Sequence, residues 1–291
     1  MKTPRTIKGI DEIIDKYDVF ILDQWGVMHD GLKGFSHAIK ISEKLNKLNK
    51  DLIIISNSSR RKKLTIEKLP LLGFNPENFI EVMTSGEMTW KNLYLSMNYF
   101  KNKNKINCYY IRNKLNDDSD IFIQGLEQYN FVENIEEANF ILGRTLNENS
   151  KTEDFLPLLL KALKKKLPFY CANPDYVSIQ KQKFNICMGT IAELYKSLGG
   201  EIVILGKPCV DIYIESTKKL KKLEKSKILA IGDSIYHDIK GANEFGVDSL
   251  LITSGIHQTS FDKTNPQWDS EFNKFKKLDI LPTYLCQKFK N

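Results

Sequence analysis

Short apolar runs alternate along the first hundred residues with longer segments in which apolar residues recur at helical spacing. Three of these runs are predicted to be buried strands: 19–22, 51–56 and 79–83. A helix is predicted after each strand, ending near residues 49, 72 and 97, and Ser36 is expected to be the N-cap of the first. This alternation predicts a parallel, doubly wound sheet and therefore an α/β fold.

The middle of the chain keeps this alternation but places acidic, asparagine-rich loops between its elements. Its predicted strands are 107–112, 139–143 and 168–172, and its predicted helices are 152–166 and 191–198. We therefore expect an inserted α/β domain at about 100–204, between a first part of the core domain at 1–99 and a second part at 205–291.

The pattern resumes after residue 204. A helix is expected from Pro208, as its first residue, to Leu223, and a strand at 227–231 then leads to Gly232 and Asp233. A helix ending at Phe245, a strand at 249–253 and an edge strand at 280–285 complete the predicted core.

The composition is that of a globular protein. The 291 residues are 42% hydrophobic and 27% charged, and no apolar run approaches the length of a membrane span. Residues 1–17 lack the apolar segment of a secretory signal. The five cysteines are scattered and form no CxxC pair, which favours reduced thiols over disulfides or a zinc site. We therefore expect a cytoplasmic protein with no membrane partner.

The net charge of +7 comes largely from lysine-rich segments at 161–166, 218–227 and 274–277. A nucleic-acid surface is one interpretation of these segments. They lie far apart in the sequence and lack an interleaved aromatic pattern, so we interpret them as solvated helix faces and expect no nucleic-acid partner. Such a surface would attract anionic substrates weakly.

Polar residues that suit phosphate chemistry follow several predicted strands. Asp23, Ser56 with Asn57, and Asp233 stand at strand ends, which share one edge of a parallel sheet. Carboxylates gathered there would bind a hard cation, most plausibly Mg²⁺, while Ser56 and Lys207 would hold a phosphoryl group. A carboxylate can also attack phosphorus and form an aspartyl-phosphate. Taken singly, each residue also fits a structural role, such as a strand-end hydroxyl, a surface lysine or an acid near a helix N-terminus.

Four segments, in this order, resemble the motifs of the haloacid dehalogenase superfamily, in its class IIA branch of NagD-like phosphatases. They are DQWGV at 23–27, ISNSSR at 55–60, GKP at 206–208 and GDSIYHD at 232–238. NPD at 173–175 and GTIAELYKSLGG at 189–200 resemble the cap of this branch and its return to the core. The resemblance spans nearly the whole chain, and it implies a Rossmann-like core with an inserted C2-type cap.

The resemblance implies a role for each matching residue. Asp23 resembles the nucleophile, and Lys207 resembles the lysine that steadies the nucleophile and the phosphate. Asp233 resembles the acid that binds Mg²⁺, Asp238 supports the ion or its waters, and the backbone carbonyl of Trp25 is a further ligand. Ser56 and the Asn57 backbone resemble the phosphate-binding residues.

Trp25 departs from the family pattern. The family has a second aspartate there, which protonates the leaving oxygen and later activates water. The indole N–H is a donor that does not titrate usefully, and loss of a general acid/base lowers a rate by about 10² to 10⁴. We therefore predict slow turnover and interpret DxWGV as the mark of a subgroup. His29 would titrate in a useful range, but we expect His29 and Asp30 to be exposed turn residues.

The cap is expected to select the substrate. Asn173, Asp175 and Tyr176 are the candidates, and a turn built on NPD is an equally favoured interpretation. We expect a Mg²⁺-dependent phosphatase of small phosphorylated metabolites that acts through an aspartyl-phosphate. Two alternatives stay open: a weak or silent relative that binds a phosphometabolite or a protein partner, and a phosphotransferase or acyl-phosphate hydrolase. Relatives with this cap often pair through it, so a homodimer through the cap is a further expectation.

Overall fold

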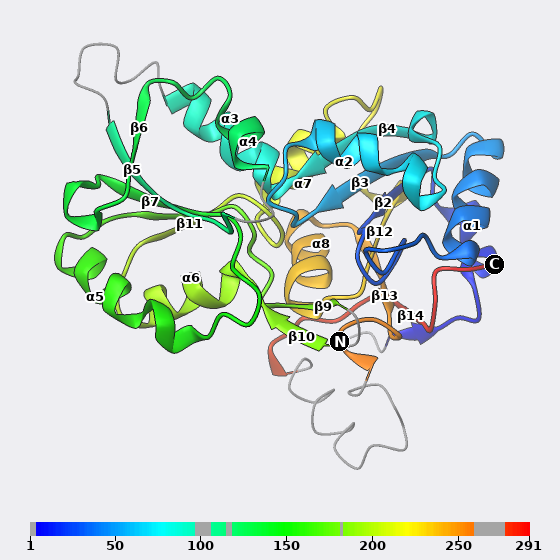
Figure 1. Ribbon diagram of the computed structural model, residues 1–291. Helices are drawn as coiled ribbons and strands as arrows, with labels where there is room; N and C mark the ends of the chain where they lie inside the picture. Colours follow the sequence, from blue (N-terminus) through cyan, green and yellow to red (C-terminus); the bar gives the residue numbers. More distant parts are fainter. Residues whose placement is uncertain (1–3, 97–105, 115–117, 181–182, 259–276) are drawn as a thin grey trace. The chain divides into compact units, whose positions relative to one another are not determined.

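The structure is a computed structural model, and it describes residues 4–96, 106–114, 118–180, 183–258 and 277–291. The chain divides into two compact units (Figure 1). The first consists of residues 1–56, 65–83 and 207–291, and the second of 57–64 and 84–206. Some of the predictions fall outside the described residues: Met97, where the third helix was expected to end, and Lys274 and Lys276 of the third lysine-rich segment. Lys277 of that segment lies within them.

The first unit is built on a seven-stranded sheet with the order β1-β14-β13-β12-β2-β3-β4. Its strands are β1 (Arg5–Thr6), β2 (Val19–Leu22), β3 (Asp51–Ser56), β4 (Phe79–Thr84), β12 (Ile228–Gly232), β13 (Asp248–Ile252) and β14 (Tyr284–Cys286). The central strand β2 is parallel to both neighbours, and Leu22 is in register with Ile54 of β3 and Ile231 of β12. The chain therefore leaves these three strands at the same edge of the sheet.

Helices of the first unit include α1 (Ser36–Lys47), α7 (Val210–Thr217), the π-helical turn at Ile235–Ile239 and α8 (Lys240–Phe245), while α2 (Lys62–Lys68) spans both units. Ala38, Ile41 and Leu45 are the fully buried apolar residues of α1, and their helical spacing gives it one face toward the core. All four residues of β2 are buried, which is the burial expected of a central parallel strand.

The second unit has its own parallel sheet with the order β11-β8-β7-β5-β6. Its strands are β5 (Ile106–Ile111), β6 (Tyr129–Val132), β7 (Phe140–Gly143), β8 (Phe169–Cys171) and β11 (Ile202–Ile204), and β9 (Val177–Gln180) and β10 (Lys183–Ile186) form a separate antiparallel pair. Its helices are α3 (Ser85–Ser96), α4 (Ser119–Ile123), α5 (Leu156–Lys164) and α6 (Met188–Ser197). Two apolar clusters fill this unit.

The predicted α/β fold with parallel sheets is confirmed, and several element boundaries are corrected. Phe35, not Ser36, is the N-cap of α1, because the Phe35 backbone N–H donates to the Met28 carbonyl and holds an extended conformation there. Helix α7 begins at Val210, two residues after Pro208, and ends at Thr217 rather than Leu223. Strand β14 is not at the edge, because the short β1 pairs outside it.

Short elements account for what the pattern did not predict. Strands β1, β6, β9, β10 and β11 and helix α4 contain two to five residues each, too few for a period to be recognised. Within the described part of the chain, no helix has both the length and the apolar character needed to cross a bilayer. The limits of the inserted domain stay a prediction.

Candidate active site

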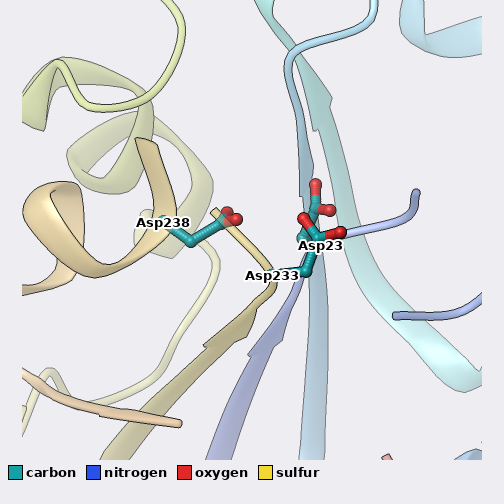
Figure 2. Close-up of side chains that lie close together, drawn as sticks. All are labelled: Asp23, Asp233 and Asp238. Carbon is teal, nitrogen blue, oxygen red and sulfur yellow. The ribbon is translucent and has the colours of Figure 1, made fainter. Parts of the chain in front are cut away.

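Two aspartates stand at the ends of neighbouring strands in the first unit. Asp23 follows β2 directly, and its backbone N–H donates to the Ile231 carbonyl at 2.9 Å. Asp233 follows the last residue of β12. Both are almost completely buried, and Figure 2 shows their carboxylates beside each other past the strand ends. The parallel pairing of β2 with β12 is what brings these two acids together.

Asp238 supplies a third carboxylate from the π-helical turn that follows β12. Its Oδ2 accepts a hydrogen bond from the Ser234 N–H at 3.0 Å, which directs the side chain back toward the strand end (Figure 2). One carboxylate oxygen from each of Asp23, Asp233 and Asp238 lies within 4.8 Å of the others. The structure thus brings together all three acids that the sequence singled out.

Lys207 joins two of these acids. Its Nζ lies 2.5 Å from Oδ1 of Asp23 and 2.6 Å from Oδ1 of Asp238, and the residue is only 3% exposed. Burial alone would lower the pKa of Lys207, but the Asp23 and Asp238 carboxylates outweigh that effect and hold the pKa above its usual value. Lys207 is therefore a permanent cation that fixes the position of the Asp23 carboxylate.

Two glycines let the backbone approach Asp233. A Cβ added at Gly26 would lie 2.0 Å from Oδ2 of Asp233, and one added at Gly255 would lie 2.1 Å from the same atom. Gly26 also has a φ of +76°, a conformation that favours glycine. Oδ2 of Asp233 accepts a hydrogen bond from the Ile256 N–H at 3.0 Å. The two glycines and this hydrogen bond fix the carboxylate in place.

The site resembles a cation site in its charge as well as its shape. Burial raises the pKa of Asp233 well above its ordinary value, and the neighbouring carboxylates of Asp23 and Asp238 raise it further. Three carboxylates therefore face one ammonium group, and their oxygens are hard ligands of the kind that Mg²⁺ prefers. The residues present fit a divalent cation, with Asp23, Asp233 and Asp238 as its side-chain ligands.

Comparisons with known proteins agree with this arrangement. A family model described as haloacid dehalogenase-like hydrolase matches residues 20–140, and one described as HAD-hydrolase-like matches residues 204–275. The structure of a hydrolase of the haloacid dehalogenase-like family from Brucella suis 1330 is 30% identical to the chain, with a TM-score of 0.77, and the match covers 86% of this chain and 90% of that one. The chain belongs to the haloacid dehalogenase-like hydrolases.

More distant structures of this family share the fold. A possible sugar phosphatase of the HAD superfamily from Cytophaga hutchinsonii is 21% identical, with a TM-score of 0.75 and 99% of both chains covered. A glycerol phosphate phosphatase from Mycobacterium tuberculosis, in complex with magnesium, is 17% identical, with a TM-score of 0.65, and the match covers 95% of this chain and 76% of that one. No curated protein sequence matches the chain significantly. The family and its class IIA branch are confirmed, and the DxWGV subgroup stays a prediction.

Trp25, the position at which this family member departs from the motif, packs within the loop after β2. An added Cβ at Gly31 would lie 2.1 Å from the end of the indole, and the Trp25 and His29 rings meet edge to face with centroids 5.4 Å apart. The loop is closed by the Gly26 N–H, which donates to the His29 carbonyl at 3.0 Å. The indole therefore has a packing role in this loop.

The expectation that His29 is exposed was wrong. His29 is 3% exposed, and its Nδ1 accepts a hydrogen bond from the Gly31 N–H at 3.0 Å. Burial lowers the pKa of His29 to about 4, with a further contribution from Lys68. His29 is thus neutral at pH 7. Asp30 is a turn residue as expected, and its Oδ1 accepts from the Leu32 and Lys33 backbone N–H groups.

The expected phosphate-binding residues end β3. Ser56 is its last residue and is buried, and Asn57 follows. Two residues predicted for separate purposes meet here, because Nδ2 of Asn57 donates to Oδ1 of Asp175 at 2.8 Å within the second unit. That contact was not foreseen, since nothing in the sequence pairs residues 118 positions apart.

The remaining cap candidates form a turn after β8. Oδ1 of Asn173 accepts from the Asp175 N–H at 3.1 Å, which is an Asx turn, and the Tyr176 carbonyl accepts from the Cys187 N–H at 2.8 Å. The Tyr176 side chain is 39% exposed. Both interpretations of NPD thus keep support: Asn173 builds the turn, whereas Asp175 and Tyr176 present side-chain groups beyond it.

Proposed function

We propose that the protein is a Mg²⁺-dependent phosphatase of small phosphorylated metabolites that acts through an aspartyl-phosphate on Asp23. The observation that carries this proposal is the position of Asp23, which lies at a strand end beside Asp233 and is held by Lys207 at 2.5 Å. The family is one of hydrolases, and structural relatives that include a possible sugar phosphatase and a glycerol phosphate phosphatase support a phosphate ester as substrate.

The reaction takes place in two steps. In the first, an Asp23 carboxylate oxygen attacks phosphorus, a new O–P bond forms, and the bond to the leaving oxygen breaks. In the second, water attacks phosphorus, inorganic phosphate leaves, and the carboxylate is restored. Lys207 pairs with the Asp23 carboxylate and keeps it aimed, and its charge offsets that of the phosphoryl oxygens. Ser56 and the Asn57 backbone bind these oxygens.

Asp23, Asp233, Asp238 and the Trp25 backbone carbonyl would hold the metal ion. Bound there, Mg²⁺ would withdraw charge from the phosphoryl oxygens and neutralise the excess of carboxylates. Substrate choice is assigned to Asn173, Asp175 and Tyr176 of the second unit. Their combination of an amide, a carboxylate and a phenol suits a small hydroxylated metabolite.

Turnover is expected to be slow with ordinary esters. Trp25 has no titrating group, and His29 is a neutral imidazole at pH 7, not an imidazolium acid, because its pKa is about 4. The leaving oxygen must therefore depart without a proton from either residue. Aryl phosphates and acyl phosphates, whose leaving groups are weak bases, are the esters that such a site would hydrolyse best.

The proposal is tested by phosphate release from an aryl phosphate with and without Mg²⁺. The parent is expected to release phosphate only with Mg²⁺, and Asp23→Asn, which keeps the shape of the side chain, is expected to release none. Release at equal rates by the parent and Asp23→Asn would remove the enzymatic proposal.

Trp25 also favours two other functions. A silent relative would bind a phosphometabolite or a protein partner. In that case the parent and Asp23→Asn would bind trifluoroberyllate with Mg²⁺ equally well, or neither would bind it. A phosphotransferase or acyl-phosphate hydrolase would need no leaving-group acid. It would pass the phosphoryl group to an added alcohol, or prefer acyl phosphates to aryl phosphates by a wide margin.

Two further assignments go with this proposal. The five cysteines are free thiols, which supports the cytoplasm as the compartment. A homodimer through the cap is proposed from the family resemblance, and sedimentation would test it.

A further inference from the structure

The four residues after Ser56, which we call the anchored segment (57–60), are tied to the rest of the second unit one after another. Nδ2 of Asn57 donates to Asp175, as described above. The next three carbonyl groups each accept one hydrogen bond, from three donors: Gly86 N to Ser58 O at 2.9 Å, Arg144 Nε to Ser59 O at 3.3 Å, and Thr84 Oγ1 to Arg60 O at 2.6 Å. The path of the backbone after Ser56 is therefore set by the second unit.

Arg144 differs from the other donors because it is a buried cation. It follows β7, its side chain has no exposed surface, and its guanidinium lies over the Phe122 ring at 4.5 Å. Besides donating to Ser59 through Nε, it donates to the Tyr110 hydroxyl through Nη1 at 2.9 Å and forms an ion pair with Asp118 through Nη2. A guanidinium is a rigid planar fork, so these three partners fix its orientation.

The Arg144 contact determines which way the Ser59 peptide group faces. A trans peptide is planar, so the Ser59 carbonyl and the Arg60 N–H point in opposite directions. This peptide lies close against the start of α3, where a Cβ added at Gly86 would lie 2.1 Å from the Ser59 oxygen. With the carbonyl turned toward Arg144, the Arg60 N–H turns away and donates to Oγ of Ser58 at 3.3 Å.

We propose that Arg144 is a positioning residue for phosphate binding. Its guanidinium holds the Ser59 peptide, and with it the anchored segment, in the orientation that lets Ser56 and the Asn57 backbone receive a phosphoryl group. This role rests on the proposed function, since it requires those two residues to bind phosphate. Binding of this kind acts on substrate, transition state and inorganic phosphate alike, so its loss raises KM and weakens inhibition by phosphate without lowering kcat.

The test compares two variants that each remove one hydrogen-bonded tyrosine hydroxyl from the second unit. Tyr110→Phe removes the acceptor of Arg144 Nη1, whereas Tyr195→Phe removes a hydroxyl that donates to the Leu167 carbonyl at 2.8 Å, away from Arg144. Arg144→Lys keeps the charge but loses the fork. KM, kcat, the inhibition constant of inorganic phosphate, its calorimetric dissociation constant with Mg²⁺ and thermal unfolding are measured for all four proteins.

Arg144→Lys is expected to raise KM and both phosphate constants about tenfold, and Tyr110→Phe about threefold, with kcat within about twofold of the parent. Tyr195→Phe is expected to change only thermal stability. Unchanged constants in a folded Arg144→Lys, or equal changes in the two tyrosine variants, would overturn the role of Arg144.

If Arg144→Lys does not fold, the two tyrosine variants decide the question alone. A parent that hydrolyses esters through Asp23, with variants that match it, overturns only the positioning role. A parent that neither hydrolyses esters nor binds phosphate overturns the proposed function together with it. If the parent binds phosphate without turnover, the calorimetric dissociation constants of phosphate for the parent and the variants still test the positioning role.

Discussion

Three buried carboxylates, with one oxygen from each within 4.8 Å of the others, and the buried ammonium group of Lys207 gather in the first unit. The fold places them there, since Asp23 and Asp233 follow strands and Asp238 lies in the π-helical turn, but the mutual repulsion of the carboxylates opposes folding. Burial is the main cause of the raised pKa of Asp233, and this repulsion raises it further. Stability and function should therefore conflict at this residue.

Asp233→Asn should stabilise the metal-free protein at pH 7 by about 1 kcal/mol, since it removes one buried charge and keeps an oxygen for the Ile256 N–H. The folded pKa of Asp233 lies well above the 3.8 of an ordinary aspartate, so its ionisation costs stability as pH rises from about 3.8 toward the folded pKa. The difference in unfolding temperature between the parent and Asp233→Asn should thus be small near pH 3.8 and should grow as the pH rises above it. A variant that is less stable than the parent at pH 7 without Mg²⁺ would contradict this.

Trp25→Asp should restore a group able to protonate the leaving oxygen. With alkyl phosphates, the expected gain in kcat is about 10² to 10⁴, and the dependence of rate on leaving-group pKa should flatten. Trp25→Phe is the control, because it removes part of the packing against Gly31 and His29 without adding an acid. The measurement is kcat for a series of phosphate esters that differ in leaving-group pKa, with all three proteins. If kcat depends equally on leaving-group pKa in all three, position 25 does not control proton transfer.

At the scale of elements, strand ends could be predicted from the sequence but the contacts between loops could not. Strands β2 and β3 were predicted at their observed limits, because their apolar runs end sharply at Asp23 and Asn57. That placed Asp23, Ser56 and Asp233 at one edge of the sheet. His29 is buried by the way its own loop folds, and the bonds of Asn57 to Asp175 and of Arg144 to Ser59 join residues far apart in the sequence. Sequence spacing gives no signal for either kind of contact. Arg144 directly follows a predicted strand, and this position was the one feature of the sequence that could have marked it as a candidate site residue.

Gly26→Ala and Gly199→Ala form a matched pair at this scale. Both residues have positive φ, of +76° and +92°, so alanine strains the backbone at each by about 1 kcal/mol. Only at Gly26 would the new methyl group meet the Asp233 carboxylate, whereas at Gly199 it meets nothing within 4 Å. Gly26→Ala should lower Mg²⁺ affinity at least tenfold by calorimetry, and Gly199→Ala should leave it unchanged. Equal affinities would mean that the loop does not shape the metal site.

At the scale of the whole molecule, the chain has the fold of the haloacid dehalogenase-like hydrolases. Family models match parts of both units, and a relative 30% identical covers most of the chain. The order of the four motifs was enough to predict the family, since each motif sits at a strand end that the fold requires. The proposal assigns substrate choice to side chains of the second unit, and a metabolite screen with Mg²⁺ would identify the substrate.

A crystal structure of the protein with Mg²⁺ and trifluoroberyllate tests the central claim most directly. The account predicts beryllium bonded to a carboxylate oxygen of Asp23, with one Mg²⁺ ion bound by Asp23 and Asp233 and the Lys207 ammonium against the fluoride atoms. Beryllium bound elsewhere, or an ion that Asp233 does not contact, would contradict it.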